Sequence, residues 1–226
     1  MYPIIAPSLL AADQMRMYEQ IKLLENTGIT QLHIDFMDGI FVPNVSFCLP
    51  FLESLRGITT QILDVHLMVE APIRFVERVR EAGADIITFN IEAAENPIKT
   101  LEKIKKTGAK AGVVIKQETP LAVITKEIEA LSDVIQIMSV TPGLFHMPQP
   151  FLSESIEKLK ALFLMRAHNG SSYAIEIDGG INIENLEMVL QAGADIVVIG
   201  SAIFRGDTAR NIKMYKEVFL QYHRGE

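Results

Sequence analysis

The chain has 226 residues, of which 49% are hydrophobic and 22% are charged, so it can bury a sizeable globular core. Its formal net charge of -7 excludes the basic surface that nucleic-acid binding requires, and no apolar run is long enough for a membrane span. We therefore expect neither nucleic acid nor a membrane as a partner. The only cysteine is Cys48, which excludes an intrachain disulfide and fits the reducing environment of the cytoplasm.

Eight apolar, β-rich runs alternate with helical patterns along the chain. The first run lies in MYPIIAPSLLAA, which lacks a basic n-region and contains two prolines, so we interpret it as a strand and not as a secretion signal. The runs cover residues 4–8, 31–37, 61–69, 85–90, 110–115, 134–140, 173–178 and 195–200. Their nearly continuous apolar character is typical of parallel strands that are covered on both faces. The pattern predicts an α/β fold, a (β/α)8 TIM barrel, as a single domain over residues 1–226.

A weak internal repeat supports the barrel. The stretches ENTGITQLHI, REAGADIITF, KKTGAKAGVV and LQAGADIVVI each place a glycine at the end of a helix, just before a strand. AGADI occurs twice, starting at Ala82 and Ala192, as a duplicated half-barrel would place it. An open doubly wound sheet is the alternative, but nothing in the repeats marks the switch point of such a sheet.

Polar side chains occur at the carboxyl ends of the predicted strands, where a (β/α)8 barrel carries its chemistry. In chain order they are Ser8, His33, Asp35, His66, Asn90, Glu92, Lys116, Ser139 and Asp178. Since alternate residues of a strand point to one side, His33 and Asp35 share a face with Met37. Burying a histidine and a carboxylate together is costly unless something pairs with them.

Two histidines and two carboxylates from three strands form a candidate site for one divalent metal ion. The ligands would be His33, Asp35, His66 and Asp178. Nitrogen and oxygen ligands without a thiolate suit Zn, Mn, Fe or Co, and the sequence does not choose among them. Taken singly, a strand histidine is usually a hydrogen-bonded core residue, and Asp178-Gly179-Gly180 is usually a turn. Their shared position at the ends of strands favours the metal site.

Two glycine-containing turns form a candidate phosphate site. Gly179-Gly180 precedes the helical pattern INIENLEMVLQ, and Gly200-Ser201 precedes a short segment in the neighbouring unit. Such turns present free N–H groups to an anion, and the seventh and eighth units of barrels often hold phosphate. Because the overall charge is negative, we expect phosphate to be captured by backbone N–H groups or by a metal.

Three methionines, Met37, Met68 and Met138, fall at the ends of the second, third and sixth strands. One interpretation is adaptable core filling. The other is an apolar floor under the reacting carbons, which would exclude water from an intermediate.

Long, ordered motifs carry a resemblance to a known family. They are APSLLAAD, HIDFMDGIFVPN, DVHLMV, EAGADIIT, IMSVTPG, EIDGG and VIGSAIF. With these motifs the sequence resembles the ribulose-phosphate 3-epimerase family over nearly its whole length. The resemblance implies a barrel of the ribulose-phosphate-binding type that interconverts ketose phosphates epimeric at C3. It also implies that the protein forms a homo-oligomer.

The resemblance also implies residue roles. It assigns metal ligation to His33, Asp35, His66 and Asp178, with Asp35 and Asp178 as the acid–base pair. It implies that Ser8 contacts the substrate. Met37, Met68, Met138 and Gly143 are further candidates for substrate contact. The expected substrate is D-ribulose 5-phosphate, converted to D-xylulose 5-phosphate.

Two stretches depart from the family pattern. Asn90 stands where the family commonly has a histidine. The segment PGLFHMPQPF, residues 142–151, keeps Gly143 but loses a downstream glycine, and Pro148 removes an N–H donor. His146 and Met147 in this segment are bulkier than the family residues. Alternatives therefore stay open: the substrate is D-allulose 6-phosphate or another sugar phosphate, or the barrel binds sugar phosphates without turnover.

Overall fold

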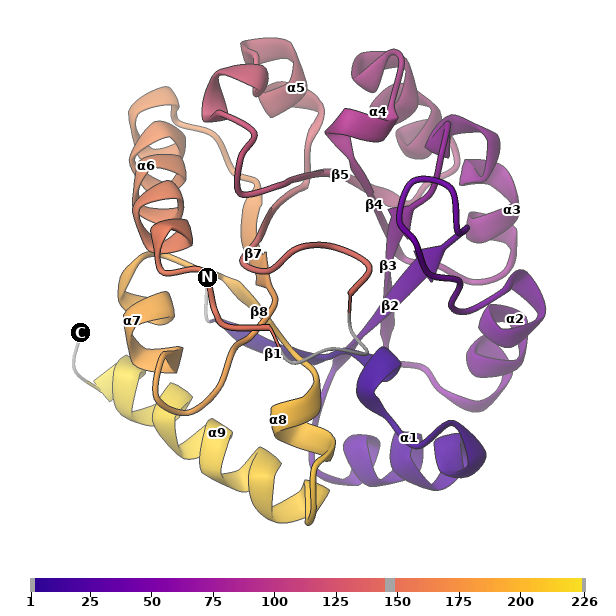
Figure 1. Ribbon diagram of the computed structural model, residues 1–226, viewed down its shortest axis with the longest axis vertical. Coiled ribbons are helices and arrows are strands. Elements are labelled where there is room, and N and C mark those ends of the chain that lie inside the picture. Colours follow the sequence, from indigo (N-terminus) through magenta and orange to yellow (C-terminus); the bar gives the residue numbers. More distant parts are fainter. Residues whose placement is uncertain (1–2, 145–148, 225–226) are drawn as a thin grey trace.

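Eight parallel strands form a nearly closed barrel in the computed structural model, which describes residues 3–144 and 149–224 (Figure 1). The strands are β1 (Ile4–Pro7), β2 (Gln31–Met37), β3 (Ile62–Met68), β4 (Ile86–Asn90), β5 (Lys110–Ile115), β6 (Val134–Met138), β7 (Ala174–Asp178) and β8 (Ile196–Ile199). Their order is β1-β8-β7-β6-β5-β4-β3-β2. A single parallel bridge between Ser8 and His33 connects β1 to β2 and brings the two edges together. The predicted (β/α)8 barrel is confirmed.

Helices surround the barrel and separate successive strands (Figure 1). They are α1 (Met17–Asn26), α2 (Leu49–Ile58), α3 (Val76–Glu81), α4 (Pro97–Lys106), α5 (Lys126–Leu131), α6 (Glu154–Asn169), α7 (Leu186–Gln191), α8 (Ser201–Phe204) and α9 (Thr208–Arg224). Short 3-10 helices lie at Leu9–Ala11, Gln14–Arg16, Pro72–Arg74, Ile91–Ala93 and Leu121–Val123. Within the described ranges, every helix is too short or too polar to cross a membrane.

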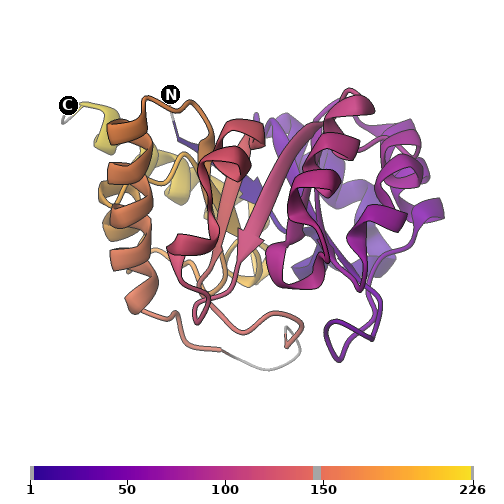
Figure 2. The ribbon, with the colours of Figure 1, turned by 90° about the horizontal axis from the view of Figure 1, so that it is seen from above.

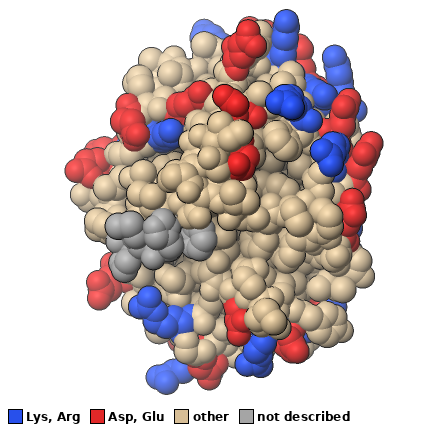
Figure 3. Space-filling view, turned by 45° about the vertical axis from the view of Figure 1, so that its right-hand side comes forward, with Lys and Arg blue, Asp and Glu red and all other residues tan. Residues whose placement is uncertain are grey.

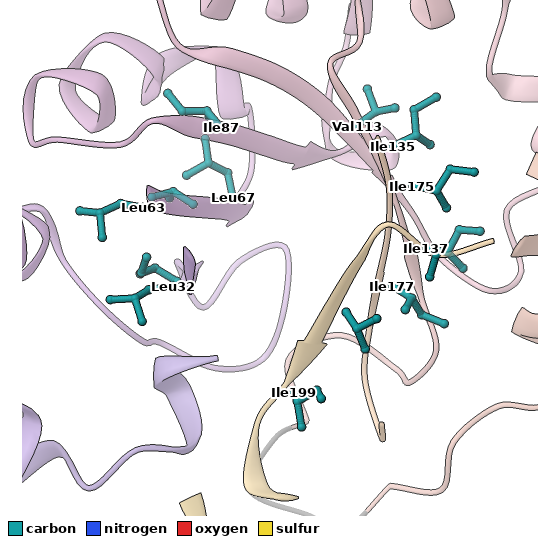
Figure 4. Close-up of a cluster of buried hydrophobic side chains, with 14 of the residues drawn as sticks. Leu32, Leu63, Leu67, Ile87, Val113, Ile135, Ile137, Ile175, Ile177 and Ile199 are labelled. Carbon is teal, nitrogen blue, oxygen red and sulfur yellow. The ribbon is translucent and has the colours of Figure 1, made fainter. Parts of the chain in front are cut away.

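The main hydrophobic core lies between the outer face of the strands and the helices. Alternate strand residues point outward and are almost fully buried, as Figure 4 shows for Leu32, Leu67, Ile135 and Ile177. Helix residues such as Leu159 complete this layer. Continuous burial on the outer face explains why the strand runs are apolar.

The side chains inside the barrel differ in polarity between the two ends of the barrel. Ile86, Val134, Ala174 and Ile196 begin their strands and pack together as a separate buried cluster. The opposite end, where the strands finish, carries polar side chains. Figure 2 shows the barrel from the side, with the segments that follow β2 and β6 projecting from this same edge. The apolar cluster therefore fills the amino end of the barrel, and the polar side chains occupy the carboxyl end.

The two AGADI repeats have the same local structure. Gly83 and Gly193 follow α3 and α7 with φ of 116° and 100°. A Cβ at Gly83 would lie 2.6 Å from the Arg56 side chain, and one at Gly193 would lie 2.5 Å from Phe163. Both positions therefore require glycine for its conformation and for space.

Candidate functional site

The carboxyl ends of the strands open into a cavity of about 720 Å³. The predicted residues that line it are Ser8, Asp35, Met37, Met68, Met138, Gly143, Asp178, Gly179, Gly180, Gly200 and Ser201. His33 and His66 do not line the cavity but contact Asp35, which does. In Figure 3, charged side chains lie mainly around the edge of the visible face, and uncharged residues form its central part. The structure brings all the predicted site residues to one end of the barrel.

The four predicted metal ligands form one compact cluster. His33 and Asp35 come from β2, His66 from β3 and Asp178 from β7, and one ligand atom of each lies within 4.8 Å of the others. Asp35 is central, since its Oδ1 lies 3.3 Å from His33 Nε2 and 3.3 Å from His66 Nδ1. The Ser8 hydroxyl donates a 2.9 Å hydrogen bond to the other Asp35 oxygen. Register explains the arrangement, because Asp35 is paired with His66 across β2 and β3.

A buried network below the cluster holds His33. Its Nδ1 is hydrogen-bonded to Asp64 Oδ2 at 3.3 Å and lies 3.2 Å from Glu176 Oε1. Gln31 donates a 2.9 Å hydrogen bond to the same Asp64 oxygen. A carboxylate only accepts, so Nδ1 carries the hydrogen and Nε2 faces Asp35. The fully buried Nε2 makes no hydrogen bond of normal geometry within the described residues.

A second network holds His66. Its Nε2 lies 2.9 Å from Asn90 Oδ1, and the Asn90 amide nitrogen lies 3.4 Å from Glu92 Oε2. The Lys116 N–H and the Thr119 hydroxyl hold Glu92 through its other oxygen. Because the amide nitrogen faces a carboxylate, the amide oxygen faces His66 and accepts from Nε2–H. His66 therefore offers Nδ1, the atom beside Asp35, as its ligand.

These donor atoms fit a divalent cation. A neutral His66 presents the lone pair of Nδ1 to Asp35 Oδ1, which is repulsive unless a cation or a proton lies between them. The same holds for the buried Nε2 of His33. Two imidazole nitrogens and two carboxylates, each histidine held by a partner on its other nitrogen, are a donor set typical of transition-metal sites.

The two acidic ligands have opposite pKa shifts. Burial, together with the negative charge of Asp35, raises the pKa of Asp178 to about 6. Burial alone would raise the pKa of Asp35, but the charge and hydrogen bond of His33, with His66, lower it below its usual range. The cavity thus contains one carboxylate that stays ionised and one that accepts a proton near neutrality, a combination that suits acid–base work.

The residues Asp64 and Glu176 were not predicted. Burial and the charge of Asp64 raise the pKa of Glu176 to about 8. Asp64 precedes His66 by two positions, and Glu176 precedes Asp178 by two, so the period of a strand places each pair on one face. That spacing is the signal in the sequence by which both could have been found.

The turns after β7 and β8 form the other side of the cavity. Gly179 and Gly180 have φ of 119° and 66°, and a Cβ at Gly179 would lie 2.5 Å from Val140. Helix α7 begins at Leu186, five residues after the start of the predicted helical pattern. The reason is local: the Asn182 side chain accepts from the N–H groups of Glu184 and Asn185, which forms a turn in competition with a helix.

The three methionines all lie on the cavity wall. Met37 and Met68 pack with Val42 in a small buried cluster that is separate from the main core. Met138 is buried beside Gln136, whose amide nitrogen lies 3.5 Å from its sulfur. This placement is compatible with the apolar floor that the sequence suggested.

The described parts of residues 142–151 cross the mouth of the barrel (Figure 1). Gly143 lines the cavity, and its carbonyl oxygen accepts a 3.0 Å hydrogen bond from Asn44. The Gln149 side chain makes two 3.0 Å hydrogen bonds with the backbone of Thr141, which joins the two sides of this segment. The departures at His146, Met147 and Pro148 lie outside the described residues.

Comparisons with known proteins agree with this site. The sequence profile described as the ribulose-phosphate 3 epimerase family matches residues 4–204. The chain is 40% identical to a ribulose-phosphate 3-epimerase from Treponema pallidum, over 89% of this chain and 91% of that protein. It is 42% identical to one from Aquifex aeolicus, over 89% of each chain. Among solved structures, KGPDC from Streptococcus mutans superposes with a TM-score of 0.74 at 14% identity, covering 98% of this chain and 99% of that one.

The structural match at 14% identity supports the barrel fold alone. The profile match and the relatives carry the classification, since both extend over most of the chain. The chain therefore belongs to the ribulose-phosphate 3-epimerase family of isomerases.

Proposed function

We propose that the chain catalyses metal-dependent epimerisation at C3 of a ketose phosphate, with D-ribulose 5-phosphate and D-xylulose 5-phosphate as the substrate pair. The observation that carries the proposal is the cluster of His33, Asp35, His66 and Asp178 at the cavity, with its two carboxylates shifted in opposite directions. The names of the relatives support this choice of substrate.

Epimerisation requires one group to remove the C3 proton and another to return a proton to the opposite face. The C3–H bond breaks and its electron pair moves toward the C2 carbonyl oxygen, giving an enediolate. A divalent ion held by the four ligands would supply positive charge to the substrate oxygens on which this negative charge develops. Asp35, ionised, acts as the base in one direction, and Asp178, protonated, acts as the acid. In the reverse direction they exchange roles.

Other residues position these groups and exclude water. Ser8 holds one Asp35 oxygen by its 2.9 Å hydrogen bond, which directs the other oxygen toward the histidines. Met37, Met68 and Met138 form the apolar part of the wall, so that the reacting carbons meet no competing proton donor there. Gly179, Gly180, Gly200 and Ser201 are proposed to hold the phosphate at the other side. The bound ion is proposed to be Zn, Mn, Fe or Co.

Deuterium incorporation tests the proposal. The metal-loaded protein is incubated in deuterated water with D-ribulose 5-phosphate, and in parallel with D-allulose 6-phosphate. We expect deuterium at C3 and the appearance of the other epimer, faster for the five-carbon substrate. Faster exchange into the six-carbon substrate would select the alternative substrate. Absence of exchange into both, with ligand binding intact, would select the non-catalytic sugar-phosphate-binding barrel.

We also propose a homo-oligomer, as the family resemblance implies, and a cytoplasmic location, which the single cysteine fits. Met15 and Tyr18, 92% and 57% exposed, are side chains that a contact between copies would cover. Analytical ultracentrifugation of the full chain tests this, and a monomer at micromolar concentration would contradict it.

A further inference from the structure

The cavity presents an electrostatic problem for a phosphorylated substrate. The chain has a net charge of -7, and two carboxylates, Asp35 and Asp178, line the cavity. A phosphate group bears about two negative charges at neutral pH. Backbone N–H groups offer only partial charges, so the site gains from a full positive charge that faces the phosphate.

Arg205 is the only lysine or arginine among the described residues that line the cavity. It directly follows α8 and therefore lies on the same side as Gly200 and Ser201, the turn proposed to hold phosphate. The acid–base residues Asp35 and Asp178 come from other strands. Arg205 is thus close in the chain to the candidate phosphate turn and separate from the strands that carry the acid–base residues.

The backbone of Arg205 is fixed although its side chain is exposed. Its N–H donates a 3.0 Å hydrogen bond to the carbonyl of Ser201. Its carbonyl accepts a 2.8 Å hydrogen bond from the Asn211 side chain, which donates a second one, 2.9 Å long, to the carbonyl of Ile203. Asn211 itself lines the cavity. The base of the arginine is therefore held in place before a ligand arrives.

The guanidinium is available for a ligand. Among the side chains that the structure describes, none forms an ion pair or a hydrogen bond with it. By contrast, Arg56 binds Asp85 and Arg166 binds Asp195 at the other end of the barrel. A planar guanidinium with five donors matches the oxygens of a phosphate better than any other side chain does.

We propose that Arg205 binds the phosphate group of the substrate and thereby selects phosphorylated ketoses over free ones. The proposal rests on the function proposed above, and it assigns to Arg205 a role in specificity without a role in proton transfer.

The test compares Arg205→Gln and Arg205→Lys with Arg210→Gln, which removes an exposed arginine of α9 that does not line the cavity. For metal-loaded Arg205→Gln, we expect the KM for D-ribulose 5-phosphate to rise about tenfold, with little change in kcat, because one exposed charge-assisted contact is lost. Competitive inhibition by inorganic phosphate should weaken by a similar factor. Arg205→Lys should lie between Arg205→Gln and the wild type, and Arg210→Gln should match the wild type.

The dependence of KM on ionic strength is an independent test of the proposal. The KM of the wild type should rise with added salt, and the KM of Arg205→Gln should rise less, because its charge contact is already absent. An unchanged KM and unchanged phosphate inhibition in Arg205→Gln would overturn the proposal, as would an equal effect of Arg210→Gln.

The outcome is separable from that of the proposed function. If the wild type incorporates no deuterium at C3 but binds inorganic phosphate in an Arg205-dependent way, the anion site stands and the epimerase proposal fails. If the wild type epimerises D-ribulose 5-phosphate with a KM independent of Arg205, the epimerase proposal stands and the proposed role of Arg205 fails.

Discussion

The two ends of the barrel carry carboxylates in opposite surroundings. At the amino end, three aspartates each accept a strand N–H and pair with a lysine or arginine: Asp85, Asp133 and Asp195. Asp85 illustrates the arrangement, since its Oδ2 accepts from Leu63 N–H at 2.9 Å and from Arg56 at 3.0 Å. Each of these carboxylates fastens the start of a strand to a neighbouring helix.

At the carboxyl end, Asp35, Asp64 and Glu176 are buried and contact imidazoles. Asp35 lies between two histidines, and Glu176 lies beside His33. Within the described residues, no lysine or arginine forms an ion pair with these carboxylates. A carboxylate paired with a lysine or an arginine, whose charge does not change near neutral pH, is structural, whereas a carboxylate buried beside imidazoles that gain and lose protons there leaves charge and proton occupancy for chemistry.

The largest expected effect comes from Asp178→Asn. The variant removes a carboxylate that we propose to transfer the proton, so the rate of epimerisation should fall about 10²- to 10⁴-fold. The free energy of unfolding of the metal-free protein should not fall, because burial already disfavours the ionised form of Asp178, as its raised pKa shows. Stopped-time product assays and urea denaturation measure the two quantities. Activity within tenfold of the wild type would refute the assignment.

The opposite pattern is expected from Asp195→Ala at the amino end. Its carboxylate is 10% exposed, accepts from Ile175 N–H at 2.8 Å and pairs with Arg166. Losing it leaves a partly buried guanidinium and an N–H without this acceptor, which should lower the free energy of unfolding by about 2–4 kcal/mol. The rate per folded molecule should stay unchanged.

The matched control is Asp85→Ala, at the same position of the other AGADI repeat. Its side chain is 40% exposed, so the loss should be smaller, about 1 kcal/mol. An equal loss at both positions in urea denaturation would show that burial does not set the strength of these contacts.

Much of the fold and of the candidate site was predictable from the sequence. Continuous apolar runs and glycines at helix ends predicted the strands, because parallel strands are covered on both faces. His33, Asp35, His66 and Asp178 were predicted because strand ends converge at one face of a barrel, whatever their separation in sequence. The structure confirms that the four lie together.

The supporting residues were harder to predict for physical reasons. The contact of Glu176 with His33 depends on which strands face each other across the barrel, which no local pattern encodes. Arg205 is an exposed cation, and nothing in its neighbours along the chain distinguishes it from a solvated one. The later start of α7 results from side chain–backbone hydrogen bonds of Asn182 and Asn185 that compete with the helical pattern.

A smaller effect is expected from Asn90→Leu. The substitution keeps the branched shape but removes the acceptor that holds His66 Nε2–H at 2.9 Å, so the histidine can present the wrong nitrogen to the cluster. Metal affinity should fall about 10- to 100-fold, as measured by competition with a chelator. Asn90→His retains an acceptor and should retain most of the affinity. Equal affinity in Asn90→Leu and the wild type would contradict the role of Asn90 as a positioning residue.

The smallest effect concerns the pH dependence of metal binding. Burial lowers the pKa of His33, but Asp35, with Asp64 and Glu176, raises it well above its usual value. In the metal-free protein His33 is then protonated at neutral pH, and a metal must displace that proton. Affinity should therefore increase with pH through neutrality, by up to about tenfold per unit for each proton released. Titrations of the metal-free protein at several pH values measure this slope. A flat profile across neutral pH would mean that His33 neither gains nor loses a proton there, which would contradict the contrast between titratable imidazoles at this end and permanently charged side chains at the other.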